Sequence, residues 1–144
     1  MRKRTQSREF ALQILYQVDI RRNVDPAEVI ADFWQTSDSA AKDKEVKEYT
    51  EKLVNGTRQN LEKIDSLIER FAENWDIRRM AYVDRNILRL STFEMVFSGE
   101  VPMKVAINEA VELAKRFGEP DSSKFVNGIL DKIAKNECPK NPTS

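Results

Sequence analysis

The sequence predicts an all-α fold of about seven helices, packed as two bundles that meet near residue 76. Gly occurs only 4 times and Pro 5 times in 144 residues, which leaves few positions for the tight turns of a many-stranded sheet. Apolar residues recur at intervals of three and four along almost every segment, which is the period of an amphipathic helix. We find no segment with the convincing alternation of a strand.

Two helices are predicted at the start of the chain. Residues 6–20 carry an apolar stripe, and Thr5 or Ser7 is expected to cap its N-terminus. Residues 26–36 follow Asp25, an N-cap residue, with proline at the first helical position and glutamate three residues after the cap. These signals define the start of the second helix more sharply than that of the first.

A long helical pattern resumes near residue 42, after a polar link over residues 36–41. It continues to Trp75, and Gly56 is expected to mark a kink or a break between two helices. A short helical turn over residues 76–80 then connects the two halves.

Three more helical segments are predicted in the second half. The first ends near Gly99, and the second begins after Pro102 and ends at Gly118, which is expected to form a left-handed C-terminal cap. The third begins near Ser122, and close helix packing is expected to explain Gly128 inside it.

The expected organisation is a single domain with three parts. Residues 1–75 form an N-terminal bundle with a basic arm, residues 76–136 form a C-terminal bundle, and residues 137–144, which contain two prolines, form a disordered tail.

Composition argues against several classes of chemistry. The chain has no His and a single cysteine, Cys138, so common general-base, zinc and disulfide arrangements are absent from the sequence. There is no Gly-rich phosphate loop and no nucleophile elbow. No apolar run approaches the ~20 residues of a membrane span, and no signal-peptide pattern opens the chain. We therefore expect a cytoplasmic protein that is not an enzyme and holds no metal or cofactor.

Charge is balanced overall but unevenly distributed. Lys plus Arg and Asp plus Glu both number 24, yet residues 1–22 are net basic and residues 23–52 are net acidic. A basic end beside an acidic stretch suggests an anionic partner at that end, although a merely solubilising N-terminus is an equal alternative.

Two places offer the chemistry of nucleic-acid binding. The first is the N-terminal basic cluster of Arg2, Lys3, Arg4 and Arg8, in which two arginines four residues apart could straddle a phosphate backbone. The second is the start of the last helix, where hydroxyls, a lysine and free backbone N–H groups could seat a phosphate. Phe125 there could stack on an unpaired base or instead close the core.

Two motifs near the C-terminus resemble the signature of the NusB family of bacterial transcription antitermination and termination factors. They are VPMKVAINEAVELAKRFG at residues 101–118 and SKFVNGILD at residues 123–131. The opening REFALQILY at residues 8–16 and the central RNILRL at residues 85–90 are also similar to this family, so the resemblance covers about residues 4–134.

The resemblance implies a fold of two three-helix bundles and a function in RNA binding. A NusB-like protein would bind boxA-type single-stranded RNA in rRNA leader transcripts together with NusE, a small-subunit ribosomal protein. That pair would then join NusA, NusG and RNA polymerase in an antitermination complex.

Carried over position by position, the resemblance also implies site residues. The RNA contacts would be Arg2, Lys3, Arg4, Arg8, Lys104, Asp121, Ser123, Lys124 and Phe125. The NusE-facing surface would include Asp84 and Leu88.

Two other interpretations stay open. One is a protein-only helical scaffold or homodimer. The other is a stand-alone relative of the NusB-like domain that precedes some rRNA cytosine methyltransferases, although 144 residues are expected to leave no room for a methyl-donor-binding domain.

Overall fold

The computed structural model describes residues 2–36 and 43–137, and within these ranges it contains helices and connecting loops but no strand. The all-α prediction is therefore confirmed. In chain order the elements are α1 (Lys3–Arg21), α2 (Pro26–Thr36), α3 (Lys44–Gln59), α4 (Leu61–Phe71), the 3-10 turn η2 (Ile77–Arg79), α5 (Tyr82–Thr92), the π-helical segment η3 (Phe93–Ser98), α6 (Met103–Phe117) and α7 (Ser122–Glu137). None of these helices is long and apolar enough to cross a bilayer.

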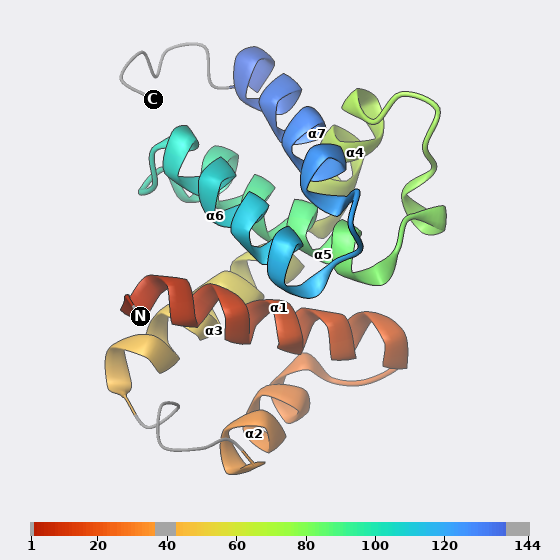
Figure 1. Ribbon diagram of the computed structural model, residues 1–144. Coiled ribbons are helices and arrows are strands. Elements are labelled where there is room, and N and C mark those ends of the chain that lie inside the picture. The colour runs from red at the N-terminus through yellow and green to blue at the C-terminus, as the bar shows by residue number, and fades with distance from the viewer. Residues whose placement is uncertain (1, 37–42, 138–144) are drawn as a thin grey trace.

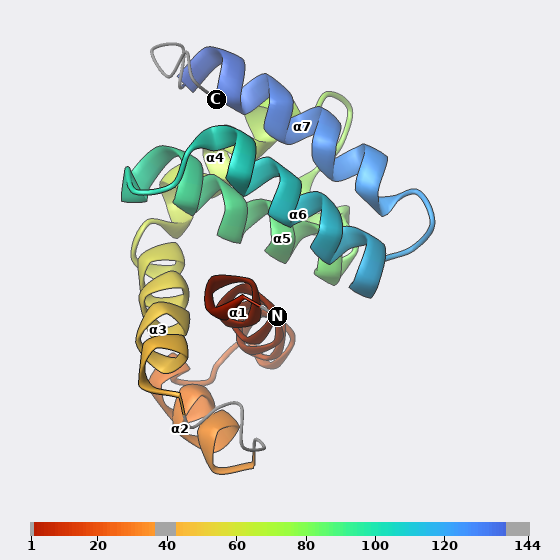
Figure 2. The same ribbon diagram turned by 60° about the vertical axis from the view of Figure 1, so that its left-hand side comes forward.

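The helices form two groups that share one core. Figure 1 shows α1, α2 and α3 in one group and α4 to α7 in the other, and α1 crosses against α5. A view turned by 60° shows α1 lying between α3 and the α5–α6 layer (Figure 2). One continuous cluster of buried residues joins the groups, from Ile14 of α1 to Ile87 of α5 and Leu130 of α7.

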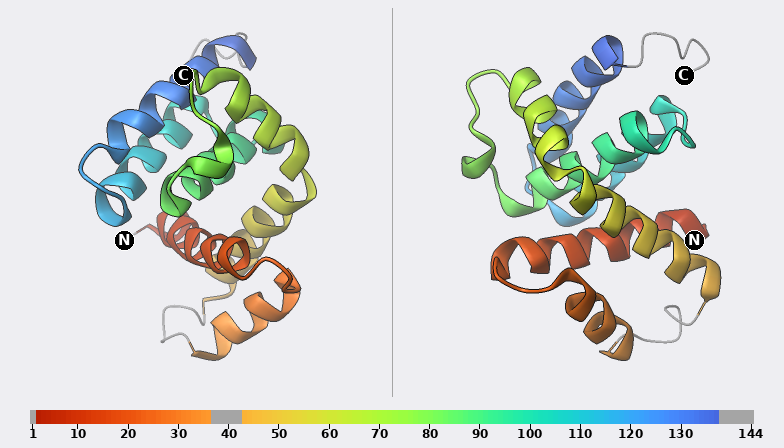
Figure 3. Two further views of the ribbon diagram at one scale, coloured as in Figure 1. Left: turned by 90° about the vertical axis from the view of Figure 1, so that its right-hand side faces the viewer. Right: turned by 180° about the vertical axis from the view of Figure 1, so that it is seen from behind.

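The packing of α4 decides where the two groups meet. Views from the side and from behind show α3 leading directly into α4 while the chain passes from one group to the other (Figure 3). α4 packs mainly against α5 and α7, although it lies in the expected N-terminal unit of residues 1–75. The division of the single domain into residues 1–75 and 76–136 stays a prediction.

Several predicted boundaries are confirmed by local hydrogen bonds. The Asp25 side chain accepts a hydrogen bond from the Ala27 N–H at 3.0 Å, as expected of an N-cap at the start of α2. The connecting turn is η2, and Asp76 caps it by accepting from the Arg78 N–H at 2.9 Å.

Other boundaries differ from the sequence prediction. α1 begins at Lys3, so Thr5 and Ser7 lie inside the helix and neither caps it. The Ser7 hydroxyl instead donates to the Val46 carbonyl at 3.0 Å and ties α1 to α3. At the other end, α7 extends through Glu137, and the rest of the expected tail, residues 138–144 with Cys138, lies outside the described residues.

The glycines also have roles other than those predicted. The break between α3 and α4 falls at Asn60, whereas Gly56 lies within α3, where an added Cβ would be 2.1 Å from Phe93 Cζ. Gly118 has a φ of −97° and so is not a left-handed cap. A Cβ there would be 2.6 Å from Ser122 Oγ, so it is close packing that requires glycine. Gly128 has open space around it, contrary to the expected helix contact.

Candidate nucleic-acid interface

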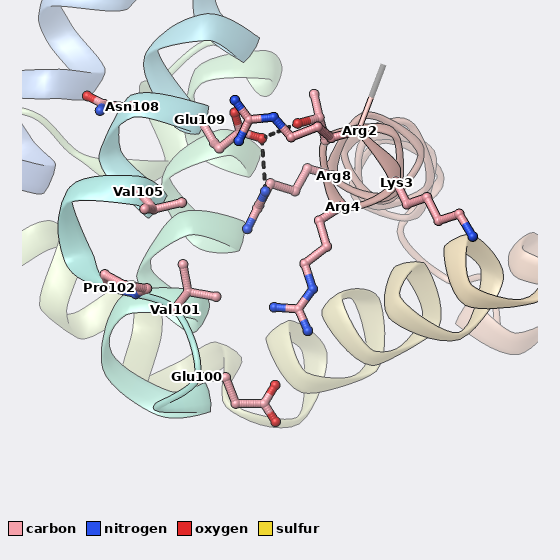
Figure 4. A pocket seen from close by; sticks show the side chains of 11 residues that line it. Arg2, Lys3, Arg4, Arg8, Glu100, Val101, Pro102, Val105, Asn108 and Glu109 are labelled. Carbon is pink, nitrogen blue, oxygen red and sulfur yellow. Dashed lines mark hydrogen bonds and ion pairs between the residues drawn. The ribbon is translucent and has the colours of Figure 1, made fainter.

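The first turns of α1 lie beside the N-terminal half of α6 and the loop before it. Between them is a cavity of about 500 Å³, open to solvent, with cationic side chains on one wall and apolar side chains on the other (Figure 4). Its lining includes Arg2, Lys3 and Arg4 from the start of α1, and Val101 and Val105 from the α6 side.

The three basic residues at this end are exposed, but they differ in their partners. Lys3 forms ion pairs with Asp43 at 3.3 Å and with Glu45 at 3.4 Å, so part of its charge is already compensated. The guanidinium carbon of Arg4 lies 4.3 Å from the centroid of the Tyr49 ring. This cation–π contact orients the side chain, and no carboxylate in the part of the chain that the structure describes forms an ion pair with it.

Arg8 does not join this exposed cluster, which corrects the expectation that it straddles a phosphate with Arg4. Its side chain is 5% exposed. Its Nε and Nη2 donate to the two carboxylate oxygens of Glu94 at 2.7 and 2.9 Å, and its Nη1 donates to Glu109 at 2.8 Å. Burial alone would lower the pKa of Arg8, but the hydrogen bonds and charge of Glu94 hold it above its usual value.

Glu94 connects this ion pair to Tyr49, the residue whose ring lies against Arg4. It is 1% exposed, lies in η3, and also accepts a hydrogen bond from the Tyr49 hydroxyl. Burial raises the pKa of Tyr49, and the charge of Glu94 raises it further, so the phenol stays a donor. The π-helical turn at Glu94 is the kind of local distortion often found at functional sites. Here it joins α1, α3 and η3 at the base of the cavity.

Lys104 lies next to the same cavity. It is exposed in the first turn of α6, between the cavity-lining residues Pro102 and Val105. Val105 is 43% exposed, so an apolar surface lies beside the cations. The family resemblance grouped Lys104 with the residues at the start of α7, but the structure places it at the end of the molecule that carries the basic arm.

Two further cavities follow the seam between α1 and α6, and we call this row of three cavities the groove. A second cavity of about 270 Å³ is lined by Glu9, Glu112 and Arg116, and a third of about 270 Å³ by Gln13, Tyr16 and other residues. The residue numbers rise together along both helices, so the three cavities follow one line. An ion pair from Arg116 to Glu9, at 2.6 Å, compensates a carboxylate that would otherwise repel an anion there.

The start of α7 lies beyond the far end of this groove. Asp121 and Lys124 are exposed and Ser123 is half-buried, while Ser122 is buried and its hydroxyl accepts from the Glu119 N–H at 2.9 Å. That hydroxyl therefore serves the turn and is not aimed at solvent.

The Phe125 ring at this helix start is neither sealed in the core nor free. It packs partly against the core, and its centroid lies 5.3 Å from that of Trp75 with an angle of 73° between the rings. One side of the ring packs and the residue remains half-buried, so Phe125 closes the core only in part, and its stacking on a base stays a prediction.

The two predicted RNA-contacting regions lie at opposite ends of α6. A helix of 15 residues rises ~1.5 Å per residue, so the basic cavity and the α7 start are separated by roughly 22 Å. The structure does not gather these residues into one pocket, and only an extended ligand could contact both groups.

The two residues expected to face NusE have different environments. Leu88 is 0% exposed, so its side chain cannot meet a partner, and this expectation is corrected. The Leu88 side chain belongs to the shared core of buried residues. The spacing of residues in the sequence did not reveal this burial. Asp84 is half-buried, and its Oδ1 is buried without a hydrogen-bond partner among the described residues.

Four residues of interest were not singled out from the sequence. Tyr16 and Ile20 are 37% and 43% exposed on α1, and the Tyr16 ring packs edge-on against Tyr82, two residues before Asp84. Trp75 is 51% exposed beside Phe125, and Tyr49 supports Arg4. Helical periodicity assigns apolar residues to the core by default, so it gave no signal for exposed aromatic residues.

No cluster of three potential metal ligands occurs in the part of the chain that the structure describes.

Comparison with known proteins identifies the family of the chain. The profile of the NusB family matches residues 5–135. The Transcription antitermination protein NusB of Myxococcus xanthus is 43% identical over 135 residues, which cover 93% of this chain and 96% of the relative.

Solved structures agree with this match. NusB of T. maritima superposes with a TM-score of 0.86 at 40% identity, covering 97% of this chain and 95% of that one. A crystal structure of the antitermination factors NusB and NusE in complex with dsRNA gives a TM-score of 0.85 at 34% identity, covering 94% and 98%. Sequence and structure together show that this chain belongs to the NusB family.

Proposed function

We propose that this chain is a non-catalytic RNA-binding adaptor of transcription antitermination, which binds boxA-type single-stranded RNA of rRNA leader transcripts. The observation that carries the proposal is the row of cavities between α1 and α6, which begins at the exposed cations Arg2 and Arg4 and ends at Phe117. Helix α7, which carries Phe125, begins five residues after Phe117. Membership of the NusB family and the likeness to a NusB–NusE complex with RNA support it.

The two ends of the groove contribute different interactions. Arg2, Arg4 and Lys104 bind phosphates at one end, and each neutralised phosphate releases counterions. Phe125 stacks on an unpaired base at the other end, which suits RNA because bases in single strands present open faces. At 3.4 Å per nucleotide, the roughly 22 Å between the ends corresponds to about six stacked nucleotides.

Five other residues carried over from the family resemblance have secondary roles in this proposal. Lys3 and Lys124 add positive charge near each end, and Ser123 is placed to donate a hydrogen bond to the strand. Asp121 is exposed and acidic, so it discourages a phosphate at the α7 start and favours base contact there. Arg8 holds α1 in place through Glu94 and does not itself bind phosphate.

We place the NusE-binding surface around Asp84. Asp84, which is half-buried at the start of α5, lies near the exposed Tyr16 and Ile20 of α1, and together they form a mixed apolar and acidic surface. Tyr16 also lines the third cavity, so this surface borders the far end of the groove. Bound to RNA and NusE, the chain would act in the cytoplasm and join NusA, NusG and RNA polymerase.

A gel shift with labelled boxA-type RNA, with and without NusE, tests the proposal. We expect a shift with boxA RNA that a scrambled strand of the same composition does not compete away, and a stronger shift when NusE is added. Absence of a specific shift in both conditions would leave a protein-only scaffold or homodimer as the better explanation, and size-exclusion chromatography would then measure the oligomeric state.

A further inference from the structure

Trp75 is the most exposed of the large apolar residues that stand out on the described surface, with 51% of its surface open to solvent. One exposed apolar side chain needs no explanation by itself. What distinguishes Trp75 is its neighbour, because its ring lies 5.3 Å from that of Phe125. Although 50 positions separate the two residues in the sequence, the fold brings them together at the start of α7.

The position of Trp75 is fixed by the turns on either side of it. Asn74 has a φ of 66°, a left-handed conformation that asparagine tolerates better than most residues, and the Trp75 N–H donates to the Ala72 carbonyl at 2.9 Å. On its other side, Asp76 caps η2 through its bond to the Arg78 N–H. The ring is thus held at the surface before any ligand arrives, which reduces the conformational entropy lost on binding.

From this arrangement we infer that Trp75 and Phe125 together form a base-stacking site for single-stranded RNA, with Trp75 as a binding residue in its own right. The inference rests on the proposed RNA-binding function and extends it.

Aromatic faces bind bases with little sequence preference, and the two rings stand at 73° to each other. A base that stacks on one ring therefore meets the other ring near its edge, so the pair can accept a base at a bend in the strand.

The charges near the pair favour a base over a phosphate. Lys124 is exposed nearby, but Glu119 and Asp121 are exposed as well, so the α7 start is not a strongly positive surface. Phosphate binding belongs to the other end of the groove, at Arg2 and Arg4. The RNA strand is thus bound by charge at one end and by aromatic stacking at the other.

The fluorescence of Trp75 provides a direct test. Only two tryptophans occur in the chain, and Trp34→Phe leaves Trp75 as the single emitter. The variant is titrated with unlabelled boxA-type RNA, and fluorescein-labelled RNA reports binding separately by anisotropy. We expect saturable quenching of Trp75 emission with the same midpoint as the anisotropy curve.

Substitutions then measure the contribution of the ring. Trp75→Ala is expected to weaken RNA binding by about 5- to 150-fold, the range for loss of one base–aromatic stack. Trp75→Phe should retain most of the affinity. Lys135→Ala, at an exposed residue in the last turn of the same helix that carries Phe125, is the control and should bind RNA like the parent. Circular dichroism melting checks that each variant is folded.

The other outcomes separate this inference from the proposed function. If the parent binds RNA but Trp75 emission and the affinity of Trp75→Ala are unchanged, the stacking role is wrong and the RNA function stands. If Trp75→Ala instead weakens NusE binding without RNA, the surface belongs to a protein partner and the inference is overturned. If the parent binds no RNA with or without NusE, both proposals fail.

Discussion

Arg8 and Glu94, 86 residues apart in the sequence, form a buried bidentate ion pair with hydrogen bonds of 2.7 and 2.9 Å. The pair joins α1 to the π-helical segment η3. Removing one partner of such a pair leaves an uncompensated charge in the core, which typically destabilises a protein by about 3–5 kcal/mol.

Glu94→Gln is therefore expected to lower the free energy of unfolding by about 3–5 kcal/mol, measured by urea denaturation. The matched control is Glu45→Gln, which removes the ion pair to Lys3 from a side chain that is 75% exposed, and it should change stability by less than about 1 kcal/mol. Equal losses in the two variants would show that the Arg8–Glu94 pair has no special structural role.

The basic arm should determine the salt dependence of RNA binding. Arg4→Ala removes one exposed guanidinium from the phosphate end of the groove, so affinity should fall and the slope of log K against log salt should become shallower by about 0.7, the value for one single-strand phosphate contact. Lys135→Ala, at an exposed lysine in the last turn of α7, is the control. A parental slope in Arg4→Ala would contradict the role of the arm.

Glu100 is an acidic residue that lines the cavity together with Arg2 and Arg4, and its substitution should strengthen RNA binding. Glu100 pairs with Lys52, whose hydrogen bond and charge hold the pKa of Glu100 below its usual value, and Arg4 contributes to the same shift. Glu100→Gln removes a negative charge that competes with phosphate for these cations. We expect tighter RNA binding with a steeper salt slope, and weaker binding by filter titration would contradict this account of the cavity.

Much of the fold could be predicted from the sequence because helical period and capping are local signals. The apolar stripe and Asp25 placed α2 correctly, and Gly99 does end the segment after α5, with a φ of 69°. The roles of Gly56 and Gly118 could not be predicted, because each is set by a side chain that packs against it in the folded structure.

The residues of the candidate site also divide into those that a sequence motif marks and those whose environment is set by distant contacts. Lys104 and the basic arm were singled out as candidate RNA contacts because they belong to recognisable motifs, but their closeness in space depends on how α6 packs beside α1. The burial of Arg8 depends on Glu94 and Glu109, which lie about 86 and 100 residues away, so no local pattern revealed it. The pairing of Trp75 with Phe125, 50 residues away, likewise has no local signal.

Two glycines inside helices allow a matched test of packing. Gly128 has open space around it, so Gly128→Ala should stabilise the protein by about 0.5–1 kcal/mol through helix propensity alone. Gly56→Ala gains the same propensity but forces a Cβ against the buried Phe93 ring, so a net loss of about 1–3 kcal/mol is expected. Thermal melting of both variants compares them, and stabilisation by Gly56→Ala would show that Phe93 can move away at little cost.

A second buried network should make stability depend on pH in the acid range. Asp19 accepts hydrogen bonds from Arg85 at 2.7 and 2.8 Å and from Asn86 at 2.8 Å. Burial alone would raise the pKa of Asp19, but these bonds and the charge of Arg89 hold it below its usual value. Between the lowered folded pKa and the unfolded value of about 3.9, the unfolded chain binds a proton that the folded chain does not.

The stabilisation from Asp19 is therefore fully present above about pH 5 and is lost as the pH falls through the folded pKa. Asp19→Asn should cost about 3–5 kcal/mol at pH 7, because Arg85 loses its carboxylate partner and Arg89 keeps only Asp65. The difference from the parent should shrink steadily between pH 5 and pH 3. Chemical denaturation at a series of pH values measures this difference in the free energy of unfolding. A difference that stays constant across this range would show that Asp19 titrates alike in the folded and unfolded states, and the ion network would then contribute nothing to acid sensitivity.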